Sequence, residues 1–232
     1  MLAKGRESVQ IEDQAVSVLD EHATEKYLGR KLALDSPHEA ELQNRIAAGW
    51  AAFHKHKGEM CSSSYKLKDR LELFKSVVDP VVLYGSGTWA LTMSMEARLR
   101  TARRRMLRYV LRIHRRKHGL ENEAWVESVK RSAHTVESMA NFHDIENWVA
   151  GYRRRKWRLA GRLARQTDER WSTKLLELRP CRGLGRSRGH PRTRWADHIE
   201  ALAGGNWKEI AMDISQWDLL EKGLVLKVFC DS

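Results

Sequence analysis

One segment, residues 95–114, restricts the fold of this chain more than any other. Its apolar side chains recur every three or four residues, which is the spacing of one face of an α-helix. The other face carries only bases, because residues 97–120 contain ten Lys or Arg and no Asp or Glu. We therefore expect a helix with a core on one side and an anion on the other. The expected core residues are Leu99, Ala102, Met106, Val110 and Ile113.

The basic residues of the whole chain are concentrated in its middle third. Residues 96–165 hold 19 Lys or Arg and 7 Asp or Glu, whereas residues 1–95 and 166–232 are close to neutral. This segment accounts for the formal net charge of +12, in a chain of which 42% is hydrophobic. The pattern favours a folded protein that binds polyanions, of which nucleic acid is the commonest.

Other features of the composition favour an intracellular protein. The cysteines, Cys61, Cys181 and Cys230, are odd in number and far apart, which argues against a disulfide framework. The first 30 residues contain no apolar run of the kind that a signal peptide needs. No stretch approaches the ~20 apolar residues that span a bilayer. We expect no membrane partner.

The N-terminal part predicts a small β element followed by a helix. Period-two alternation over residues 8–19 is typical of a β-hairpin, and residues 26–29 can add a third strand. Ser36, Pro37 and Glu39 then have the spacing of a helix cap, a first helical residue and a capping-box partner.

More helices are expected further along the chain. A helix over residues 66–78 should end at Pro80, and the apolar residues 81–85 fit either a strand or a buried helical turn. Ser94 is the expected cap of the helix over residues 95–114, and Trp50 lies on the apolar face of the first helix.

The C-terminal part predicts one long helix, a loop and two shorter helices. The long helix covers residues 140–165, and residues 180–192 contain the Gly and Pro residues of a loop. Thr193 and Asn206 are the expected caps of the two short helices. In the second of these helices, the expected inward residues are Ile210, Ile214 and Trp217. The fold class is therefore mainly α, with a short N-terminal β-hairpin, a helical bundle and a second, Trp-rich helical domain.

Three clusters of Arg and Lys residues are candidate nucleic-acid contacts. The first is the basic face of the helix over residues 95–114; the second is a run that can also be a nuclear localisation signal or a solvated surface. The third lies in the Gly/Arg loop, next to Trp195, which we expect in the core rather than against a base. The residues are Arg100, Arg104, Arg105, Arg108, Arg112 and Arg115; Arg153, Arg154, Arg155 and Lys156; and Arg186, Arg188, Arg192 and Arg194.

No catalytic or metal-binding motif stands out. His114 and His118 have helical metal-ligand spacing, but the bases between them disfavour a cation and no third ligand is evident. Neither a nucleophile elbow nor a Walker loop is present. We expect no catalytic residues, no metal, no cofactor and no small-molecule substrate; the oligomeric state is left open.

Several short motifs follow one another in an order that resembles a known family. They are Tyr27-Leu28-Gly29, Arg45-Ile46, Trp50 to Phe53, Leu83-Tyr84-Gly85 with Trp89, Arg104 to Arg108, Trp157 to Gly161, Arg170-Trp171, Gly189 to Trp195, Trp207 and Trp217. This series resembles the palm edge, thumb and post-thumb region of reverse transcriptases from non-LTR retrotransposons. Two departures are Arg162, where the family often has His, and His190, where it often has Arg.

The resemblance implies three parts: residues 1–35 as a β remnant of the palm edge, residues 36–119 as a thumb-like helical domain, and residues 120–232 as a basic, Trp-rich helical domain. It implies that the thumb-like part follows a primer–template duplex. Polymerases of this family hold two metal ions on palm aspartates, and this sequence contains no Asp-Asp pair. Magnesium is therefore expected only for an intact polymerase with its palm.

The sequence thus predicts a truncated reverse-transcriptase fragment that binds RNA or DNA without catalysis. One alternative is a fragment of an intact RNA-directed DNA polymerase whose palm is encoded upstream. Another is a basic protein-interaction module. An intracellular location is expected, and a nuclear one if Arg153 to Lys156 act as a localisation signal.

Overall fold

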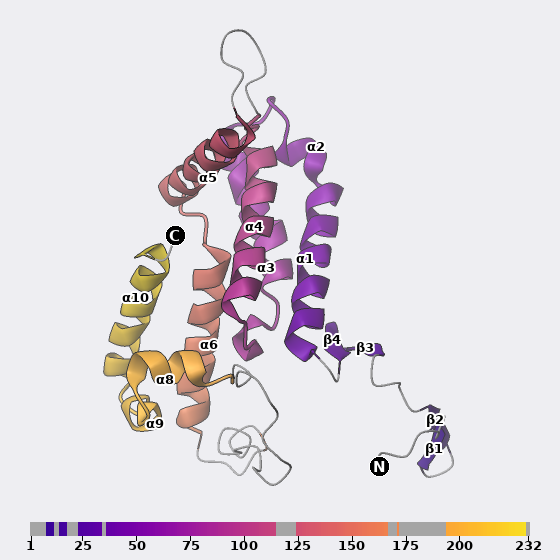
Figure 1. The fold of residues 1–232 in the computed structure, drawn as a ribbon, viewed down its shortest axis with the longest axis vertical. Coiled ribbons are helices and arrows are strands. Elements are labelled where there is room, and N and C mark those ends of the chain that lie inside the picture. The colour runs from indigo at the N-terminus through magenta and orange to yellow at the C-terminus, as the bar shows by residue number, and fades with distance from the viewer. Residues whose placement is uncertain are drawn as a thin grey trace.

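The computed structural model describes residues 8–11, 14–17, 23–33, 36–114, 124–166, 171 and 194–230. Over these residues the protein is mainly α-helical, with short antiparallel hairpins near the N-terminus (Figure 1). The predicted fold class is therefore confirmed. The predicted loop at 180–192 and the cap Thr193 lie outside the described residues.

Two separate hairpins form the β element. Strand β1 (Ser8–Ile11) pairs with β2 (Gln14–Ser17), as expected, and β3 (Thr24–Tyr27) pairs with β4 (Arg30–Ala33). Residues 26–29 therefore do not add a third strand to the first sheet. Leu28 and Gly29 both have positive φ, 47° and 78°, which is the turn that suits the twist of a two-residue hairpin.

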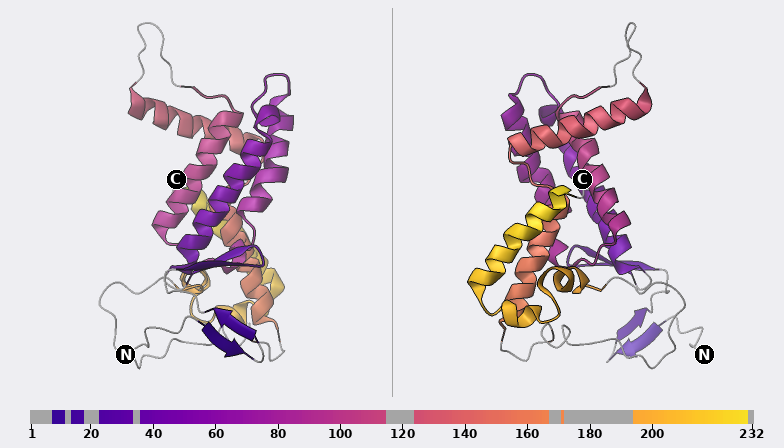
Figure 2. Two further views of the ribbon diagram at one scale, coloured as in Figure 1. Left: turned by 90° about the vertical axis from the view of Figure 1, so that its right-hand side faces the viewer. Right: turned by 60° about the vertical axis from the view of Figure 1, so that its left-hand side comes forward.

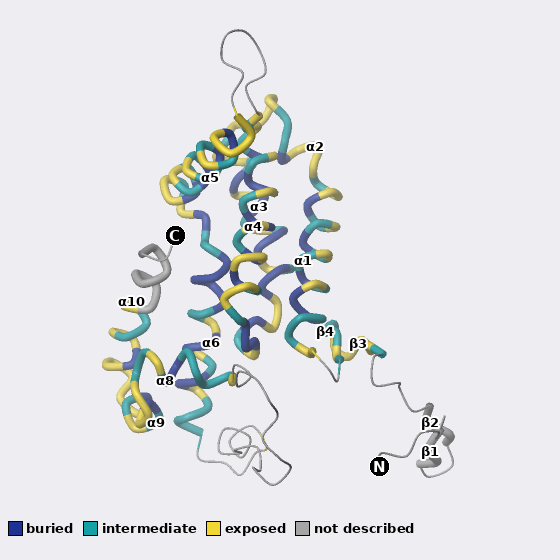
Figure 3. Tube along the Cα trace, in the orientation of Figure 1, coloured by how far each residue is buried: buried dark blue, intermediate teal, exposed yellow. Residues whose placement is uncertain are grey.

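Three long helices and a fourth that crosses their end make the main bundle. They are α1 (Pro37–Lys55), α3 (Leu67–Val82) and α4 (Met93–Val110), with α5 (Trp125–Phe142) across one end (Figures 1 and 2). The short helices α2 (Lys57–Met60) and η1 (Ser86–Thr88) lie in the connections, and α6 (Trp148–Ala164) extends from the bundle. Buried residues line the inner faces of these helices (Figure 3). Fully buried members are Leu42, Phe53, Phe74, Val78, Leu99 and Met106.

Several predicted helix boundaries are wrong for local reasons. Pro80 lies inside the last turn of α3 rather than ending it, because the apolar residues that follow are buried and continue the helix to Val82. The cap of α4 is Thr92, whose hydroxyl accepts from the Met95 amide at 3.3 Å; Ser94 instead bonds to the Thr92 hydroxyl.

The expected capping box at the start of α1 does not form. The Ser36 side chain makes no cap hydrogen bond, and the Glu39 carboxylate pairs with Arg98 of α4. The long helix predicted over residues 140–165 is also divided, since α5 ends at Phe142 and Asn147 caps α6 by accepting from the Val149 amide at 2.9 Å.

A second apolar cluster joins α6 to the C-terminal helices α8 (Asp197–Ala203), α9 (Trp207–Ile210) and α10 (Ile214–Cys230). Its centre is Trp157 stacked on Trp217, with ring centroids 3.8 Å apart. Each indole N–H donates to the other residue's carbonyl, at 3.0 and 3.2 Å. The expected inward position of Trp217 is confirmed, whereas Ile214 is exposed and Asn206 makes no side-chain cap bond.

The boundary expected near residue 120 stays a prediction. The first apolar cluster contains residues from both sides of it, because Val136 and Ala140 of α5 and Trp148 of α6 pack with α3 and α4. The Trp148 indole also donates to the buried Asp79 carboxylate of α3 at 2.7 Å. Burial raises the pKa of Asp79 to about 7.

Candidate nucleic-acid interface

The buried face of α4 consists of the residues that the spacing predicted, and arginines lie on its outer side. Leu99, Ala102, Met106 and Val110 are buried, and Ile113 is half-buried against the core. Arg105 and Arg108 lie on the outer side of the last turns of α4, and Arg112 follows the end of the helix at Val110. Within the described part of the chain these arginines take part in no ion pair.

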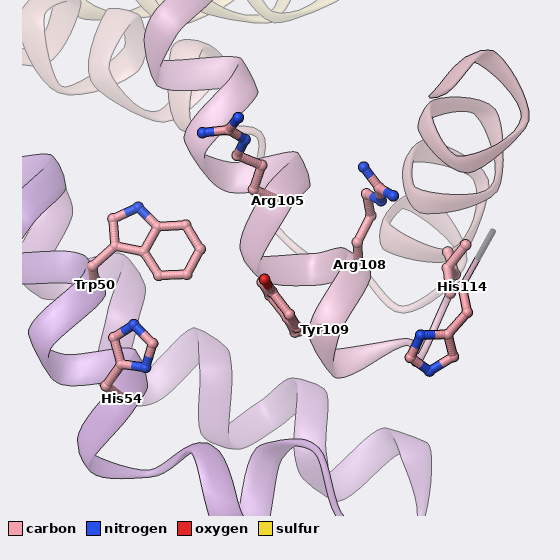
Figure 4. Close-up of a pocket in the computed structure, with 7 residues that line it drawn as sticks. Trp50, His54, Arg105, Arg108, Tyr109 and His114 are labelled. Carbon is pink, nitrogen blue, oxygen red and sulfur yellow. The ribbon is translucent and has the colours of Figure 1, made fainter. Parts of the chain in front are cut away.

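A groove between α1 and α4 lies beside these arginines. One hollow of about 590 Å³ is lined by Trp50 and His54 of α1 and by Arg105, Arg108 and Tyr109 of α4, with Ile113 and His114 beyond (Figure 4). A second hollow of about 330 Å³ shares Trp50 and Arg105 with it. We call the two together the α1–α4 groove.

Aromatic rings make up much of this groove. The Trp50 and His54 rings stack with centroids 5.6 Å apart, and the Tyr109 ring meets Trp50 edge-on at 6.3 Å. Tyr109 is 52% exposed, and the Lys57 ammonium lies 5.6 Å from its ring centre. Cations and exposed rings at one place can contact phosphates and bases together.

Arg108 contributes a donor that the fold leaves unused. Its Nε atom is buried and has no hydrogen-bond partner in the described residues. A buried charged donor without an acceptor costs free energy, so an acceptor from a ligand would stabilise this arrangement. In Figure 4 the Arg105 and Arg108 side chains both extend from α4, with Arg105 nearer to Trp50 and Arg108 nearer to His114.

The other predicted bases of α4 have structural roles. The Arg104 Nε donates to Glu137 of α5 at 2.7 Å, and Arg100 is half-buried and interacts within the protein. Arg103 was not among the predicted nucleic-acid contacts, and its side chain is only 1% exposed. Its guanidinium donates to Glu137 and to the Ile145 and Glu146 carbonyls, each at 3.0 Å.

The basic run on α6 is largely neutralised. Arg153 pairs with Glu96 of α4 at 2.7 Å, while Arg154 and Arg155 both pair with Glu146, at 2.5 and 3.1 Å. These carboxylates come from α4 and from the α5–α6 connection, so the neutralisation is not visible as a local sequence pattern.

Lys156 is a correction to the predicted contact set. It is 1% exposed, and its ammonium lies 5.6 Å from the centre of the Trp195 ring, because this position faces the inside of α6. Its Nζ has no hydrogen-bond partner in the described residues, and burial lowers its pKa to about 8. A surface contact between Lys156 and a phosphate is therefore contradicted.

The remaining predicted bases are placed only in part. Arg115, Arg186, Arg188 and Arg192 lie outside the described residues, as does His118. Arg194 is exposed and pairs with Asp197 and Glu200. Trp195 packs against the second apolar cluster and donates to the Gly87 carbonyl at 2.8 Å, so its predicted core position is confirmed.

The aromatic residues of the groove were not predicted from the sequence to be part of a binding site. Trp50 was expected in the core, and it does pack against the first cluster, but it also lines both hollows. Two signals were available: His54 follows Trp50 by one helical turn, and Tyr109 lies directly after Arg108 on the basic side of α4.

Two negative findings apply to the described residues. No group of three or more His, Cys, Asp or Glu could hold a metal ion there. Among the helices so described, none is long and apolar enough to cross a membrane.

The fold and the groove together define a mainly helical protein with an arginine- and aromatic-lined surface groove. The chain is similar to an uncharacterized transposon-derived protein of Caenorhabditis elegans, 30% identical over 202 residues that cover 82% of this chain and 67% of the relative. It belongs to the family of that transposon-derived protein. No known family profile matches the chain, and no solved structure matches it significantly.

Proposed function

We propose that this protein derives from the palm edge, thumb and post-thumb region of a non-LTR retrotransposon reverse transcriptase, and that it binds RNA or DNA without catalysing polymerisation. The transposon-derived relative supports the origin. The observation that carries the binding is that Arg105 and Arg108 line the α1–α4 groove beside the Tyr109 ring and form no ion pair with any described residue. Arg112, which follows the end of α4, likewise forms no ion pair within the described part of the chain.

Contacts between the motifs support the proposed origin. The Tyr84 hydroxyl donates to the Leu28 carbonyl at 3.2 Å, and the Arg45 guanidinium lies 4.7 Å from the centre of the Tyr84 ring. Arg45 also donates to the Gly29 carbonyl and pairs with Glu41 at 2.7 Å. Motifs that are up to 56 residues apart therefore form one unit at the end of the bundle.

Arginine–phosphate contacts explain why binding should depend on salt. Each phosphate that a cation neutralises releases counterions, so affinity falls steeply between about 50 and about 200 mM salt. Two paired clusters, on α6 and around Arg194, contribute little to this release because their carboxylates already compensate them.

Fluorescence anisotropy with labelled RNA and DNA tests the proposal. For Arg105→Ala/Arg108→Ala we expect the slope of log affinity against log salt to flatten by about two units. Arg154→Ala/Arg155→Ala removes the same charge from a paired cluster and should leave the slope nearly unchanged. Absence of binding to any polynucleotide at low salt would contradict the proposal, and primer extension by the purified chain would favour the polymerase alternative.

A comparison with liposomes separates nucleic-acid binding from binding to an anionic membrane surface. Anionic vesicles at the same ionic strength should bind more weakly than polynucleotide, because the groove presents rings and guanidinium groups rather than an extended apolar face. Stronger binding to the vesicles would reject the proposed function.

A further inference from the structure

We propose that the α1–α4 groove takes unpaired nucleotides, so that the protein prefers single-stranded RNA or DNA to duplex. This inference rests on the proposed function and names the form of nucleic acid that the groove recognises. It goes beyond the primer–template duplex that the family resemblance implies.

The first argument is the recessed position of the Trp50 ring. Trp50 is half-buried between α1 and α4, and it lines both hollows of the groove. The bases of a duplex are stacked on one another, so a side chain below the surface cannot stack on them. Unpaired bases can turn out of the strand and lie against an aromatic ring.

The second argument is the size of the hollow. Its volume of about 590 Å³ is many times the ~30 Å³ share of one water molecule in the liquid. It is open to the surface next to His54 and Tyr109 (Figure 4). A flat ring system can therefore enter, with its sugar and phosphate left at the mouth.

The third argument is the position of the cations relative to the rings. Arg105 and Arg108 are three residues apart, which separates them by about 4.5 Å along the axis of α4. Both lie on the same groove wall as Tyr109. A strand with a base in the hollow would thus have its phosphates beside guanidinium groups. The guanidinium groups of Arg105 and Arg108 can donate to phosphate or base oxygens.

The test compares ligands built on one strand of fixed length, so that every strand carries the same number of phosphates. They are a mixed-sequence single strand, its blunt duplex, and the same single strand with abasic sites at its centre. We expect the intact strand to bind about tenfold tighter than the duplex, and each abasic site to weaken binding by about 5- to 150-fold. Parallel RNA and DNA series show which sugar the groove accepts.

Variants connect the base dependence to the groove. Tyr109→Ser changes a half-exposed ring, and Trp50→Leu changes the recessed one; both should lose the difference between intact and abasic strands and keep the salt slope. Arg105→Ala/Arg108→Ala should do the reverse. Because Trp50 contacts Phe53, circular dichroism checks the fold of Trp50→Leu. The abasic ligands need no change to the protein.

The outcomes separate the two proposals. Equal affinity for single strand, duplex and abasic strand, with a normal salt slope, overturns the inference and leaves the proposed function intact. Failure to bind any of the ligands at low salt overturns both. Base dependence that persists in Tyr109→Ser and Trp50→Leu shows that unpaired bases bind elsewhere, and the groove is then rejected.

Discussion

Helices α4 and α6 each carry a run of basic residues, and the two runs differ in how far carboxylates compensate their charge. On α6, Arg153 and Arg158 pair with carboxylates 57 and 63 residues away, at Glu96 and Glu221. On α4, Arg105 and Arg108 have no such partner among the residues that the structure describes. The number of Lys and Arg residues in a segment therefore does not determine how much positive charge is left uncompensated. That charge also depends on which Asp and Glu residues the tertiary structure brings next to the segment.

Each helix also buries one basic side chain, and the two buried side chains differ in their partners. Arg103 of α4 donates to a carboxylate and two carbonyls, so its charge is compensated. Lys156 of α6 has a buried ammonium without a hydrogen-bond partner in the described residues. Burial of a paired charge is tolerated, whereas burial of an unpaired one opposes folding.

The largest expected effect comes from breaking the paired site. Arg103→Met should lower the free energy of unfolding by about 3–5 kcal/mol, because Glu137 and two carbonyls lose their donor. Urea unfolding followed by tryptophan fluorescence measures the change. Arg105→Met on the exposed side is the control and should stay within about 0.5 kcal/mol. Equal effects of the two substitutions would contradict the comparison.

The next effect has the opposite sign. Lys156→Met should raise the free energy of unfolding at pH 7 by about 1–3 kcal/mol, because it removes the buried, unpaired ammonium. The folded-state pKa of about 8 lies below the ordinary value of 10.5. Wild-type stability should therefore rise as pH increases from about 8 to about 10.5, since the unfolded chain holds the proton longer.

The same unfolding measurement, repeated across this pH range, checks the sign. The advantage of Lys156→Met over wild type should shrink towards the high-pH end. Lys68→Met, at an exposed position, should show no such trend. A constant advantage would mean that the gain comes from packing and not from the charge.

The smallest effect concerns the surface of α6. Glu146→Gln leaves Arg155 without its carboxylate and leaves Arg154 with Glu221 at 3.6 Å, so nucleic-acid affinity at low salt should rise roughly two- to fivefold. Stability should change by less than about 1 kcal/mol, because the ion pairs are partly exposed. Glu72→Gln makes the same change in net charge on an exposed part of α3. An equal rise in both variants would show that only total charge matters.

Local patterns predicted much of the fold because they depend on neighbours along one helix. The buried face of α4 and the inward position of Trp217 followed from spacing alone. The first hairpin followed from its alternation. Pro80 was misjudged because tertiary burial of the residues after it outweighed a local helix-ending signal.

The candidate site was predicted only in part because it depends on contacts between distant segments. The sequence identifies Arg105 and Arg108 as bases on one helical face, but it does not show that α1 brings Trp50 beside them. Nor does the sequence show that Arg104 forms an ion pair with Glu137, or that the Lys156 side chain is buried. These facts depend on how the helices pack.

The stacked tryptophans of the second cluster have a consequence for how the family can vary. A Cβ atom on Gly161 would lie 2.4 Å from the Trp217 indole nitrogen, closer than two such atoms can approach. Any side chain at position 161 must therefore displace that ring. In an alignment of homologues, positions 161 and 217 should covary. Where position 161 is not glycine, position 217 should carry a residue smaller than tryptophan. Along a lineage, the substitution of Trp217 by a smaller residue should precede the loss of Gly161.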